Sequence, residues 1–439
     1  MSEPIDAVVV GARCAGSAAA IALARAGRRV VVLDRVCFPA DTISTHLVWP
    51  GGLAEIDALG ALDRVEALGA PRLPEALAGG AGYTVRGSFS PTGGIDYAMC
   101  VRRIGLDAAL VATAREAGAG VREGARVIEL VWQDDRVAGV RYRDAADAVH
   151  ELRAPLVVGA DGRRSTVARL VGADTPYRSE PSGRACFYAY WRDARSDLRG
   201  IAAQWREGPE LGTAFPCDGG QLLVLIQPPV ARLADFDGDL AGAYRRTVYA
   251  MGPLAERLQG CEMVTKVRSA RDIASYFRRS SGPGWALAGD AGHFKDPVTA
   301  QGIRDALRYG RLLGEDVAAV LSEPAALDVA VAAWERRRER DCLEVYQWTN
   351  ILARGEAMTA LEVELYRAAA AQPATARELL DVFSRTRRPG AFMSPVRAAQ
   401  LCARALARDG ADRSATLAAA ARELSTALAD ARERRAALR

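Results

Sequence analysis

The chain has 439 residues, of which 50% are hydrophobic and 26% charged, and its 58 basic and 54 acidic residues leave a formal net charge of +4. This balance is typical of a folded globular protein and excludes a disordered, collagen-like or coiled-coil chain. So small a charge over this length gives no footprint for nucleic acid or an anionic membrane. Two or three domains are expected, and no apolar run reaches the roughly 18 residues of a membrane span.

The N-terminus and the cysteines predict a cytoplasmic protein. Met1-Ser2-Glu3-Pro4 lacks the basic and then apolar pattern of a signal peptide. The 8 cysteines are scattered singly, with no Cys-x-x-Cys and no histidine at ligand spacing, which argues against a disulfide framework or a zinc site. With only 3 histidines in the chain, no metal site is predicted.

The first forty residues follow the order of a dinucleotide-binding site: strand, glycine-rich turn, helix, strand and acid. An apolar strand over Ile5–Val10 runs into Gly11-Ala12-Arg13-Cys14-Ala15-Gly16, and a helix to about Ala26 precedes a second strand over Arg29–Leu33. The start of that helix offers free N–H groups to a pyrophosphate. Asp34, 23 residues after Gly11, can accept hydrogen bonds from a ribose hydroxyl pair.

The glycine-rich turn departs from the usual fingerprint at one position. Gly11 permits the tight turn, and Gly16 lets the helix approach the strand closely. Arg13 stands where the middle glycine normally lets the backbone approach the pyrophosphate. Its side chain must therefore either point outward or add its own charge to the phosphates.

Two further segments indicate which dinucleotide binds. Val157-Val158-Gly159-Ala160-Asp161-Gly162 is an apolar strand that enters an Asp-Gly turn, and Trp285–Ala288 is a second such strand that leads into Gly289-Asp290-Ala291-Gly292-His293. Pro297-Val298-Thr299-Ala300-Gln301-Gly302 follows. Together with the first turn, over residues 4–325, these segments resemble the class A FAD-dependent monooxygenases, or aromatic hydroxylases. The geranylgeranyl reductases and flavin-dependent halogenases belong to the same superfamily.

The resemblance implies an α/β fold: a doubly wound, glutathione-reductase-like FAD-binding domain, a second α+β domain on an antiparallel sheet, and a helical C-terminus. The FAD domain would comprise residues 1–70, 99–177 and 270–325, and the substrate domain residues 71–98 and 178–269. Within the latter, Ala185–Trp191, Ile201–Trp205, Gly212–Phe215 and Gln221–Gln227 are strand-like runs separated by turn signals. Helices fill 326–439, with breaks near Pro373 and Arg388-Pro389-Gly390. Arg336–Arg340 is interpreted as a solvated face. The segment from about Ser414 either caps the domain or makes a homodimer.

The resemblance also assigns cofactor contacts. Asp34 would hold the adenosine ribose with Arg35 beside it, Arg103 would lie near the flavin phosphates, and Val127 would offer backbone groups to the adenine. Asp161 belongs to the motif shared by FAD and nicotinamide-nucleotide binding, and Asp290 would contact the ribityl or pyrophosphate part. The full set of expected FAD residues is Gly11, Arg13, Ala15, Gly16, Asp34, Arg35, Arg103, Val127, Asp161, Gly289, Asp290, Pro297, Gly302 and Ile303.

The segment at residues 297–302 and the helix that follows can also be interpreted on physical grounds. Pro297 interrupts regular structure, and from Ile303 apolar or small residues recur at helical spacing as far as Leu321. The N-terminus of such a helix carries roughly half a positive charge. Since reduced flavin is anionic at its N1–C2=O edge, a helix start near Gln301 would stabilise that form.

Two reactions are compatible with the resemblance, with NAD(P)H as a transient electron donor in both. The first is hydroxylation of an electron-rich aromatic or polyketide-like small molecule by molecular oxygen through a C4a-hydroperoxyflavin. The alternative is reduction of a substrate double bond, as in the geranylgeranyl reductases. The Trp-x-Trp-x-Ile-Pro motif of the halogenases is absent, whereas Thr213-Ala214-Phe215-Pro216 loosely resembles a segment of the prenyl reductases. A flavin-binding protein without turnover is a third hypothesis.

Three polar residues are candidates for catalysis. His293 and Lys295 lie in the loop before Pro297, where the isoalloxazine is expected, and Lys295 is one of only two lysines in the chain. A compact ammonium there could stabilise negative charge, although a surface ion pair with Asp296 is an equally good interpretation. His46 falls where family members approach the flavin ring, as a general base or as a merely hydrogen-bonded histidine.

Overall fold

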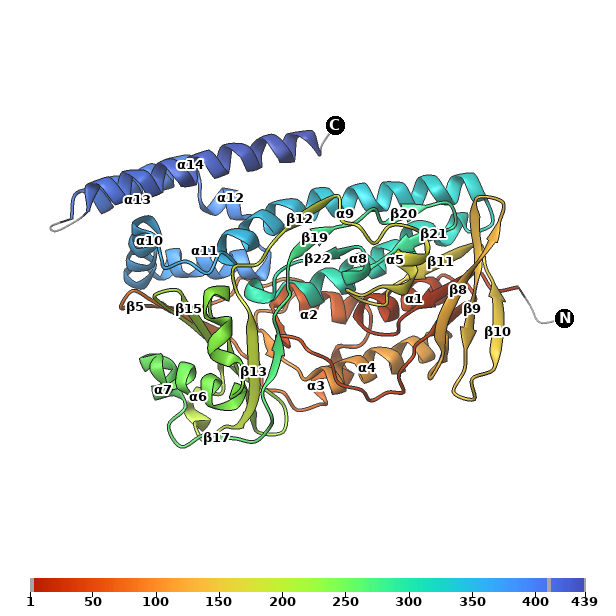
Figure 1. Cartoon of the computed structure of the whole chain (residues 1–439), viewed down its shortest axis with the longest axis horizontal. Coiled ribbons are helices and arrows are strands. Elements are labelled where there is room, and N and C mark those ends of the chain that lie inside the picture. Colours follow the sequence, from red (N-terminus) through yellow and green to blue (C-terminus); the bar gives the residue numbers. More distant parts are fainter. Residues whose placement is uncertain (1–3, 409–411, 438–439) are drawn as a thin grey trace.

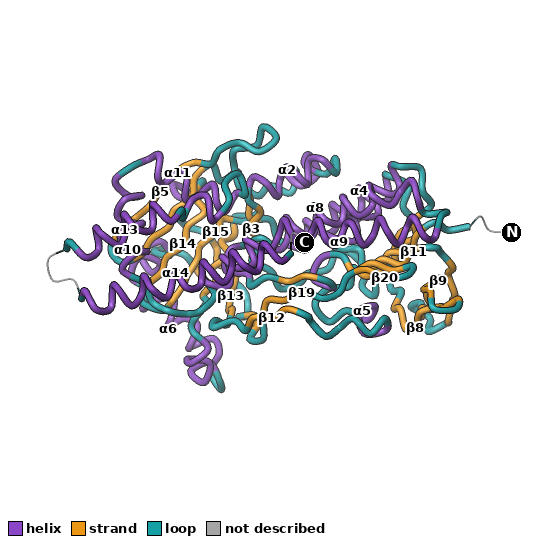
Figure 2. Tube along the Cα trace, turned by 90° about the horizontal axis from the view of Figure 1, so that it is seen from above, coloured by secondary structure: helices purple, strands orange, loops and turns teal. Residues whose placement is uncertain are grey.

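The computed structural model describes residues 4–408 and 412–437, and it forms two main sheets, each packed against its own helices (Figure 1). The sheets lie at opposite ends of an elongated molecule, and several C-terminal helices gather at the end that holds the second sheet (Figure 2). Within the described residues no helix has both the length and the apolar character needed to cross a bilayer.

The first sheet has six strands, with β1 (Ala7–Val10) in the centre. Its neighbours run parallel to it, and only the short edge strand β20 is antiparallel. The order is β20 (Ser281–Gly282), β21 (Trp285–Leu287), β11 (Leu156–Gly159), β1, β2 (Val30–Leu33) and β7 (Gly120–Arg122). This arrangement confirms the doubly wound α/β fold and the first three expected elements.

The two faces of β1 are covered differently, because successive side chains of a strand point to opposite sides. Val9 packs with α1 (Cys14–Arg25) and α8 (Gly302–Val317). Val8 and Val10 instead pack with an antiparallel sheet of β8 (Arg126–Gln133), β9 (Arg136–Arg143) and β10 (Val149–Arg153). All four residues of β1 are buried, which explains its continuous apolar sequence.

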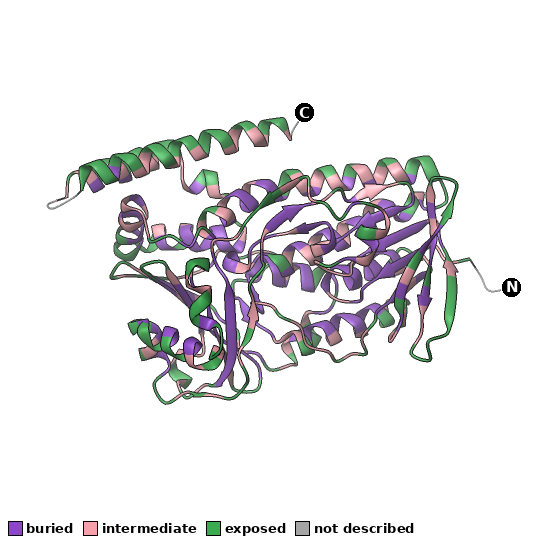
Figure 3. Cartoon of the chain, viewed as in Figure 1, coloured by how far each residue is buried: buried purple, intermediate pink, exposed green. Residues whose placement is uncertain are grey.

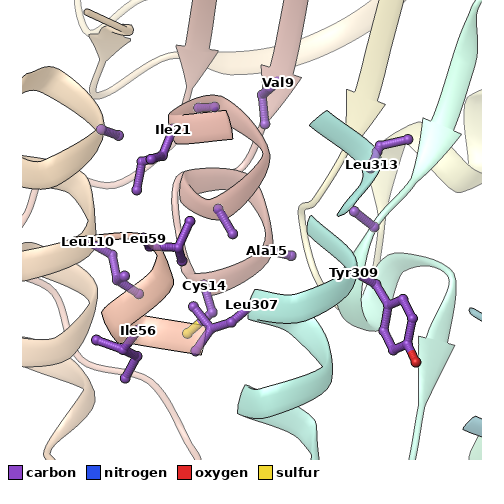
Figure 4. Close-up of a cluster of buried hydrophobic side chains, with 14 of the residues drawn as sticks. Val9, Cys14, Ala15, Ile21, Ile56, Leu59, Leu110, Leu307, Tyr309 and Leu313 are labelled. Atoms are coloured by element: carbon purple, nitrogen blue, oxygen red, sulfur yellow. The ribbon is translucent and has the colours of Figure 1, made fainter. Parts of the chain in front are cut away.

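Helices α1 and α8 pack against each other through small residues (Figure 4). A Cβ atom placed on Gly310 would lie 2.4 Å from the carbonyl oxygen of Ala15, and one on Gly314 would lie 2.7 Å from the Cβ of Ala22. Glycine at these positions lets the two helices approach closely. Around this contact Ile21, Leu307 and Leu313 are completely buried.

The second sheet has eight strands and is antiparallel except where β14 pairs with β4. It combines two segments that are far apart in the sequence, and the four strand-like runs of the sequence analysis are all strands. The members are β4 (Glu75–Gly80), β5 (Tyr83–Ser88), β13 (Cys186–Arg192), β14 (Ile201–Glu207), β15 (Glu210–Pro216), β16 (Gln221–Ile226), β17 (Glu262–Met263) and β18 (Arg268–Ala270).

The faces of this second sheet separate its aromatic residues. Tyr188 and Tyr190 pack in one cluster with Phe215, on the side shared with residues from the first domain. Phe187 and Trp191 pack in another cluster, beneath α6 (Leu240–Ala250) and α7 (Gly252–Arg257). The aromatic residues therefore lie on both faces, as expected, and Tyr188 and Tyr190 face Leu47 and Trp49 of the N-terminal part of the chain.

Shorter elements connect the two main sheets. Strands β12, β19 and β22 form a three-stranded sheet, and β3 pairs with β6. Their bounds, with those of the remaining N-terminal helices, are β3 (Leu47–Val48), β6 (Met99–Cys100), β12 (Arg178–Glu180), β19 (Ser275–Phe277), β22 (His293–Phe294), α2 (Pro50–Ala58), α3 (Leu62–Glu66), α4 (Arg103–Glu116) and α5 (Thr166–Leu170).

The C-terminal helices divide between the two cores. The long helix α9 contributes Trp334 and Cys342 to the first core, whereas α10, α11 and α13 pack with residues of β4 and β5. Beyond the two expected breaks, the helices are also interrupted between α9 and α10 and between α13 and α14. The bounds are α9 (Pro324–Leu352), α10 (Ala360–Ala371), α11 (Pro373–Ser384), α12 (Pro389–Phe392), α13 (Pro395–Leu406) and α14 (Arg413–Ala436).

The interpretation of Arg336–Arg340 as a solvated face is wrong for one member. Arg338 is only 1% exposed, and its guanidinium donates to the carbonyl oxygen of Leu287 at 3.1 Å and to the hydroxyl of Ser280 at 2.9 Å. It also lies over the ring of Trp334. Arginine combines a long apolar stem with several donors, so a run of charges in sequence does not show which member turns inward.

We predict that Gly310→Ala lowers the free energy of unfolding by about 1–3 kcal/mol, because the added methyl group has to push α8 away from the backbone of α1. Gly252→Ala is the matched control, since its Cβ would meet no atom within 4 Å. Urea unfolding of both variants measures the difference. A Gly310→Ala protein as stable as Gly252→Ala would contradict the tight α1–α8 contact.

Candidate functional site

The three sequence segments meet at the carboxyl ends of the parallel strands. Gly11 follows β1 and donates its N–H to the carbonyl oxygen of Leu33 at 2.8 Å. Ala160 donates to Val10 at 2.7 Å, and Ala288 donates to Gly159 at 2.8 Å. Hydrogen bonds between neighbouring strand ends therefore place the Gly11 turn, Asp34, Asp161 and Asp290 along one edge. Ligands of doubly wound sheets bind at this edge.

Close backbone contacts explain both glycines of the first turn. Gly11 has φ +101°, and a Cβ there would lie 2.4 Å from the carbonyl oxygen of Ala160. A Cβ on Gly16 would lie 1.8 Å from the carbonyl oxygen of Gly11. Arg13 has φ −78°, which any residue adopts, so the backbone itself does not require glycine at this middle position.

A buried carboxylate holds two arginines beside the start of α1. Asp107 on α4 is fully buried and forms ion pairs with Arg13 and with Arg103, whose Nη2 lies 2.8 Å from its Oδ1. Arg13 also donates to the carbonyl oxygen of Ala40 at 3.2 Å. In the structure the guanidinium of Arg13 is paired with the carboxylate of Asp107. Sequence reasoning missed Asp107, although it lies one helical turn after Arg103.

Asp34 ties the second strand to the glycine-rich turn. Its Oδ2 accepts from the N–H of Ala12 at 2.7 Å, and its Oδ1 accepts from the N–H of Val36 at 3.0 Å. Each oxygen keeps a lone pair that could accept from a ribose hydroxyl. The carbonyl oxygen of Asp34 accepts from Ala125 at 2.8 Å, which brings the β8 strand with buried Val127 to this side. Arg35 is exposed.

Asp161 has a structural task in addition to its place at the edge. Its Oδ2 accepts from the N–H of Thr166 at 2.6 Å, and its Oδ1 accepts from the hydroxyl of Ser165 at 2.6 Å. The carboxylate thus satisfies free donors at the start of α5, where negative charge is favourable. Burial raises the pKa of Asp161, and the hydrogen bonds from α5 oppose that rise.

The start of α8 and Asp290 provide a test of whether FAD fits. Gln301 gives α8 no side-chain cap, and the space around Gly302 is open, since a Cβ there would meet nothing within 4 Å. The carboxylate of half-buried Asp290 has no hydrogen-bond partner among the described residues, and its pKa is raised by burial against the opposing charge of Arg103. Free helix N–H groups and a free acceptor match the anionic ring edge and the hydroxyl groups of FAD.

Close packing of the helices positions these groups. Gly289 has φ +59°, and a Cβ there would lie 2.7 Å from the Cβ of Ala15. Ala15 therefore allows the Asp290 turn to lie against α1. Pro297 begins a short 3-10 turn, Pro297–Thr299, whose start is capped by Asp296. Ala300 then adopts φ +52°, and α8 begins at Gly302 with Ile303 buried beside it.

His46 lies between the cofactor domain and the second sheet. Its side chain is fully buried, and Nε2 accepts from the hydroxyl of Tyr190 at 2.6 Å. Nδ1 lies 2.7 Å from the carbonyl oxygen of Ser44, so it carries the proton and donates. Burial lowers the pKa of His46 to about 4. His46 is therefore a neutral imidazole in one tautomer, directed at Tyr190.

Lys295 and His293 form a buried polar cluster between the loop and helices α8 and α9. The ammonium of Lys295 pairs with Asp305 and lies 2.9 Å from Nε2 of His293. His293 stacks on Phe277 with ring centroids 4.0 Å apart. The interpretation of Lys295 as a surface lysine paired with Asp296 is wrong: the side chain is only 2% exposed, and its partner is Asp305.

We predict that the buried imidazole of His46 makes the protein less stable in acid. Because its pKa is about 4 in the fold against an ordinary 6.5, the unfolded chain binds the extra proton first as pH falls through this interval. Relative to His46→Gln, the wild-type protein should lose up to about 3 kcal/mol of unfolding free energy between pH 7 and pH 4.

The comparison with His46→Gln is needed because burial raises the pKa of Asp296 to about 6, which acts in the opposite direction over the same interval. Urea titrations at a series of pH values measure the difference. Parallel curves for wild type and His46→Gln would contradict the neutral buried imidazole.

Comparison with known proteins agrees with this geometry. Residues 4–194 match the family model described as an FAD binding domain. Digeranylgeranylglycerophospholipid reductase 2 of Methanopyrus kandleri is 28% identical over 352 residues, which cover 76% of this chain and 81% of the relative. Menaquinone reductase of Mycolicibacterium smegmatis is 28% identical over 341 residues, covering 72% of this chain and 76% of the relative.

Solved structures share the fold. A flavoprotein/dehydrogenase from Cytophaga hutchinsonii superimposes with a TM-score of 0.75 at 20% identity, covering 87% of this chain and 93% of that one. The myxobacterial chondrochloren halogenase CndH gives a TM-score of 0.71 at 22% identity, covering 87% and 97%.

Gly11, Asp34 and Asp161 of this edge lie within the residues that match an FAD binding domain, and the expected cofactor is confirmed. The chain is an FAD-dependent oxidoreductase, and its residues 4–194 match an FAD binding domain.

Proposed function

We propose that this protein reduces a carbon–carbon double bond in an apolar, isoprenoid-like small molecule, with NADH or NADPH as the electron donor. The observation that carries the proposal is the similarity over about three quarters of the chain to two enzymes named as reductases, one of a digeranylgeranyl lipid and one of menaquinone. Because of this similarity we favour reduction over hydroxylation, the reaction that the sequence alone favoured.

The side chains between the second sheet and the cofactor edge suit an apolar substrate. They form one buried cluster that includes Trp49 from the first domain, Phe215 from β15 and Phe383 from α11, with Ala300 packed against it. Trp49 also donates its indole N–H to the carbonyl oxygen of Thr299, beside the start of α8. An apolar molecule at the cofactor edge would contact these aromatic rings.

We propose that Tyr190, a member of this cluster, supplies the proton that the reduction requires. Reduction of a double bond adds one hydride and one proton, and bound FAD supplies the hydride chemistry. The phenol of Tyr190 is held by His46 through a 2.6 Å hydrogen bond, and burial keeps its pKa raised, so it stays protonated. Tyr190 is therefore the proposed proton donor, and His46 positions its hydroxyl. The hydroxyl proton would leave Nε2 of His46 for the substrate carbon, and water would return a proton to the phenolate. The N-terminus of α8 stabilises negative charge at the edge of the bound ring.

We propose supporting roles for the other polar candidates. Lys295 and His293 would hold the loop before Pro297 against α8 and α9 through Asp305, rather than touch substrate. The 14 expected FAD residues remain the proposed cofactor contacts. All eight cysteines are free thiols, which supports the proposed cytoplasmic location.

Hydroxylation with molecular oxygen is the second candidate, and one observation favours it. Nε2 of neutral His46 is an acceptor directed at the Tyr190 hydroxyl. The pair could therefore take a proton from a phenolic substrate, which makes the ring more reactive toward an oxygen donor. The aromatic side chains around it would suit a substrate ring equally well.

Oxygen dependence separates the two reactions. For the proposed reduction, the purified yellow protein should consume NADPH and a polyprenyl substrate under strict anaerobiosis, and the product should gain two hydrogens by mass spectrometry. Hydroxylation instead requires oxygen uptake that increases when substrate is added, with a product heavier by one oxygen atom. If no NADPH is consumed without oxygen, and substrate stimulates oxygen uptake, hydroxylation would replace reduction as the proposed reaction.

We predict that Tyr190→Phe lowers substrate turnover by about 10²-fold, the range typical of a lost general acid. The rate at which NADPH bleaches the bound flavin should stay unchanged, because Tyr190 has no part in that step. Tyr244→Phe is the matched control: this buried phenol packs under the opposite face of the same sheet and bonds to the carbonyl oxygen of Val224. Equal turnover losses in both variants would remove Tyr190 from the chemistry.

A further inference from the structure

Helix α14 is attached to the molecule along one side. Thr416 is buried near its start, and Glu423 accepts from the hydroxyl of Thr359 at 2.9 Å. Near its end Glu433 accepts from Gln347 at 2.6 Å and pairs with Arg178 at 2.6 Å. These contacts occur along most of the helix and fix which side faces inward.

Much of the outward side of α14 is exposed (Figure 3). Leu417, Leu424 and Leu428 are 55%, 59% and 52% exposed. Their spacings of seven and four residues place them within about 20° of one line along the helix, with Ala421 and Ala431 close to that line. Leucines in a row on one helix face normally pack against a partner. We call Leu417, Ala421, Leu424, Leu428 and Ala431 the leucine stripe.

Among the described residues of α14, the charges nearest the leucine stripe along the helix face are positive. Arg413 precedes it, and Arg432 and Arg435 lie at its far end, all three exposed. The acidic residues of α14 and its cap lie at least about 100° around the helix from each leucine of the stripe. They are Asp412, Glu423, Asp430 and Glu433.

We propose that the leucine stripe and its three arginines bind an anionic lipid surface, with α14 lying in the plane of the interface. A second copy of this chain is disfavoured, because two identical faces would bring arginines together without acids between them. Anionic headgroups complement those arginines, and the leucines would enter the acyl boundary. The proposal is independent of the reaction at the flavin site.

The length of the helix agrees with this mode of binding. Its 24 residues span about 36 Å, and the stripe with its arginines covers most of that length. No described helix can cross a bilayer, so the contact is interfacial. Three leucines and three arginines give a modest attraction: each arginine near an anionic surface contributes about fivefold in binding.

Vesicle sedimentation of the full-length holoprotein tests the proposal. We expect binding to phosphatidylcholine vesicles that contain about 30 mol % phosphatidylglycerol, little binding to pure phosphatidylcholine, and release at high salt. Leu417→Ser/Leu424→Ser/Leu428→Ser should reduce binding at least about tenfold. Arg432→Glu/Arg435→Glu should do the same, since it reverses the charge at one end of the stripe.

Two control variants test whether a loss of vesicle binding is specific to this face of α14. Val149→Ser/Tyr249→Ser/Val329→Ser removes three similarly exposed apolar residues elsewhere, and Arg245→Glu/Arg246→Glu makes the same charge change on α6. Both controls should bind like wild type, and flavin absorbance should be unchanged in all variants. The proposal is overturned by absence of wild-type binding to anionic vesicles, by equal losses in a variant and its control, or by a dimer in light scattering that the leucine variant dissociates.

Discussion

The close approach of α1 and α8 is the constraint on which the rest of this structure depends. Gly310 and Gly314 of α8 face Ala15 and Ala22 of α1 at distances that leave no room for a larger side chain. Because α1 starts at the Gly11 turn and α8 starts beside Asp290, this contact brings both helix starts to the same sheet edge. A widened contact would separate the proposed pyrophosphate end of the site from the proposed ring end.

Buried charges then hold the surrounding loops in place. Asp107 joins α4 to the start of α1 through Arg13 and Arg103, and Asp305 joins α8 to the preceding loop through Lys295. Such pairs have little mobility once desolvated, and removal of one partner leaves an uncompensated charge. They therefore define loop positions near the cofactor edge, while the proposed chemistry uses neutral groups such as Tyr190 and His46.

Net charge and local charge give different information in this chain. A net charge of +4 gives no reason to expect an anionic surface as a partner. In α14, however, three arginines lie beside the exposed leucines, while Glu423 and Glu433 turn inward to Thr359, Gln347 and Arg178. A sum over the chain cannot detect this separation, because it depends on which side of the helix meets the body.

Sequence alone determined the nucleotide fold, since strand periodicity, glycine positions and acid spacing are local properties that the backbone must obey. Gly11, Gly16 and Asp34 therefore stand where their motif placed them. Only the tertiary structure decided the partners of long charged side chains: Lys295 turned to Asp305, Arg338 turned into the core, and Asp107 met Arg13 from 94 positions away. Flexible stems can reach several partners, and the packing of distant helices selects among them.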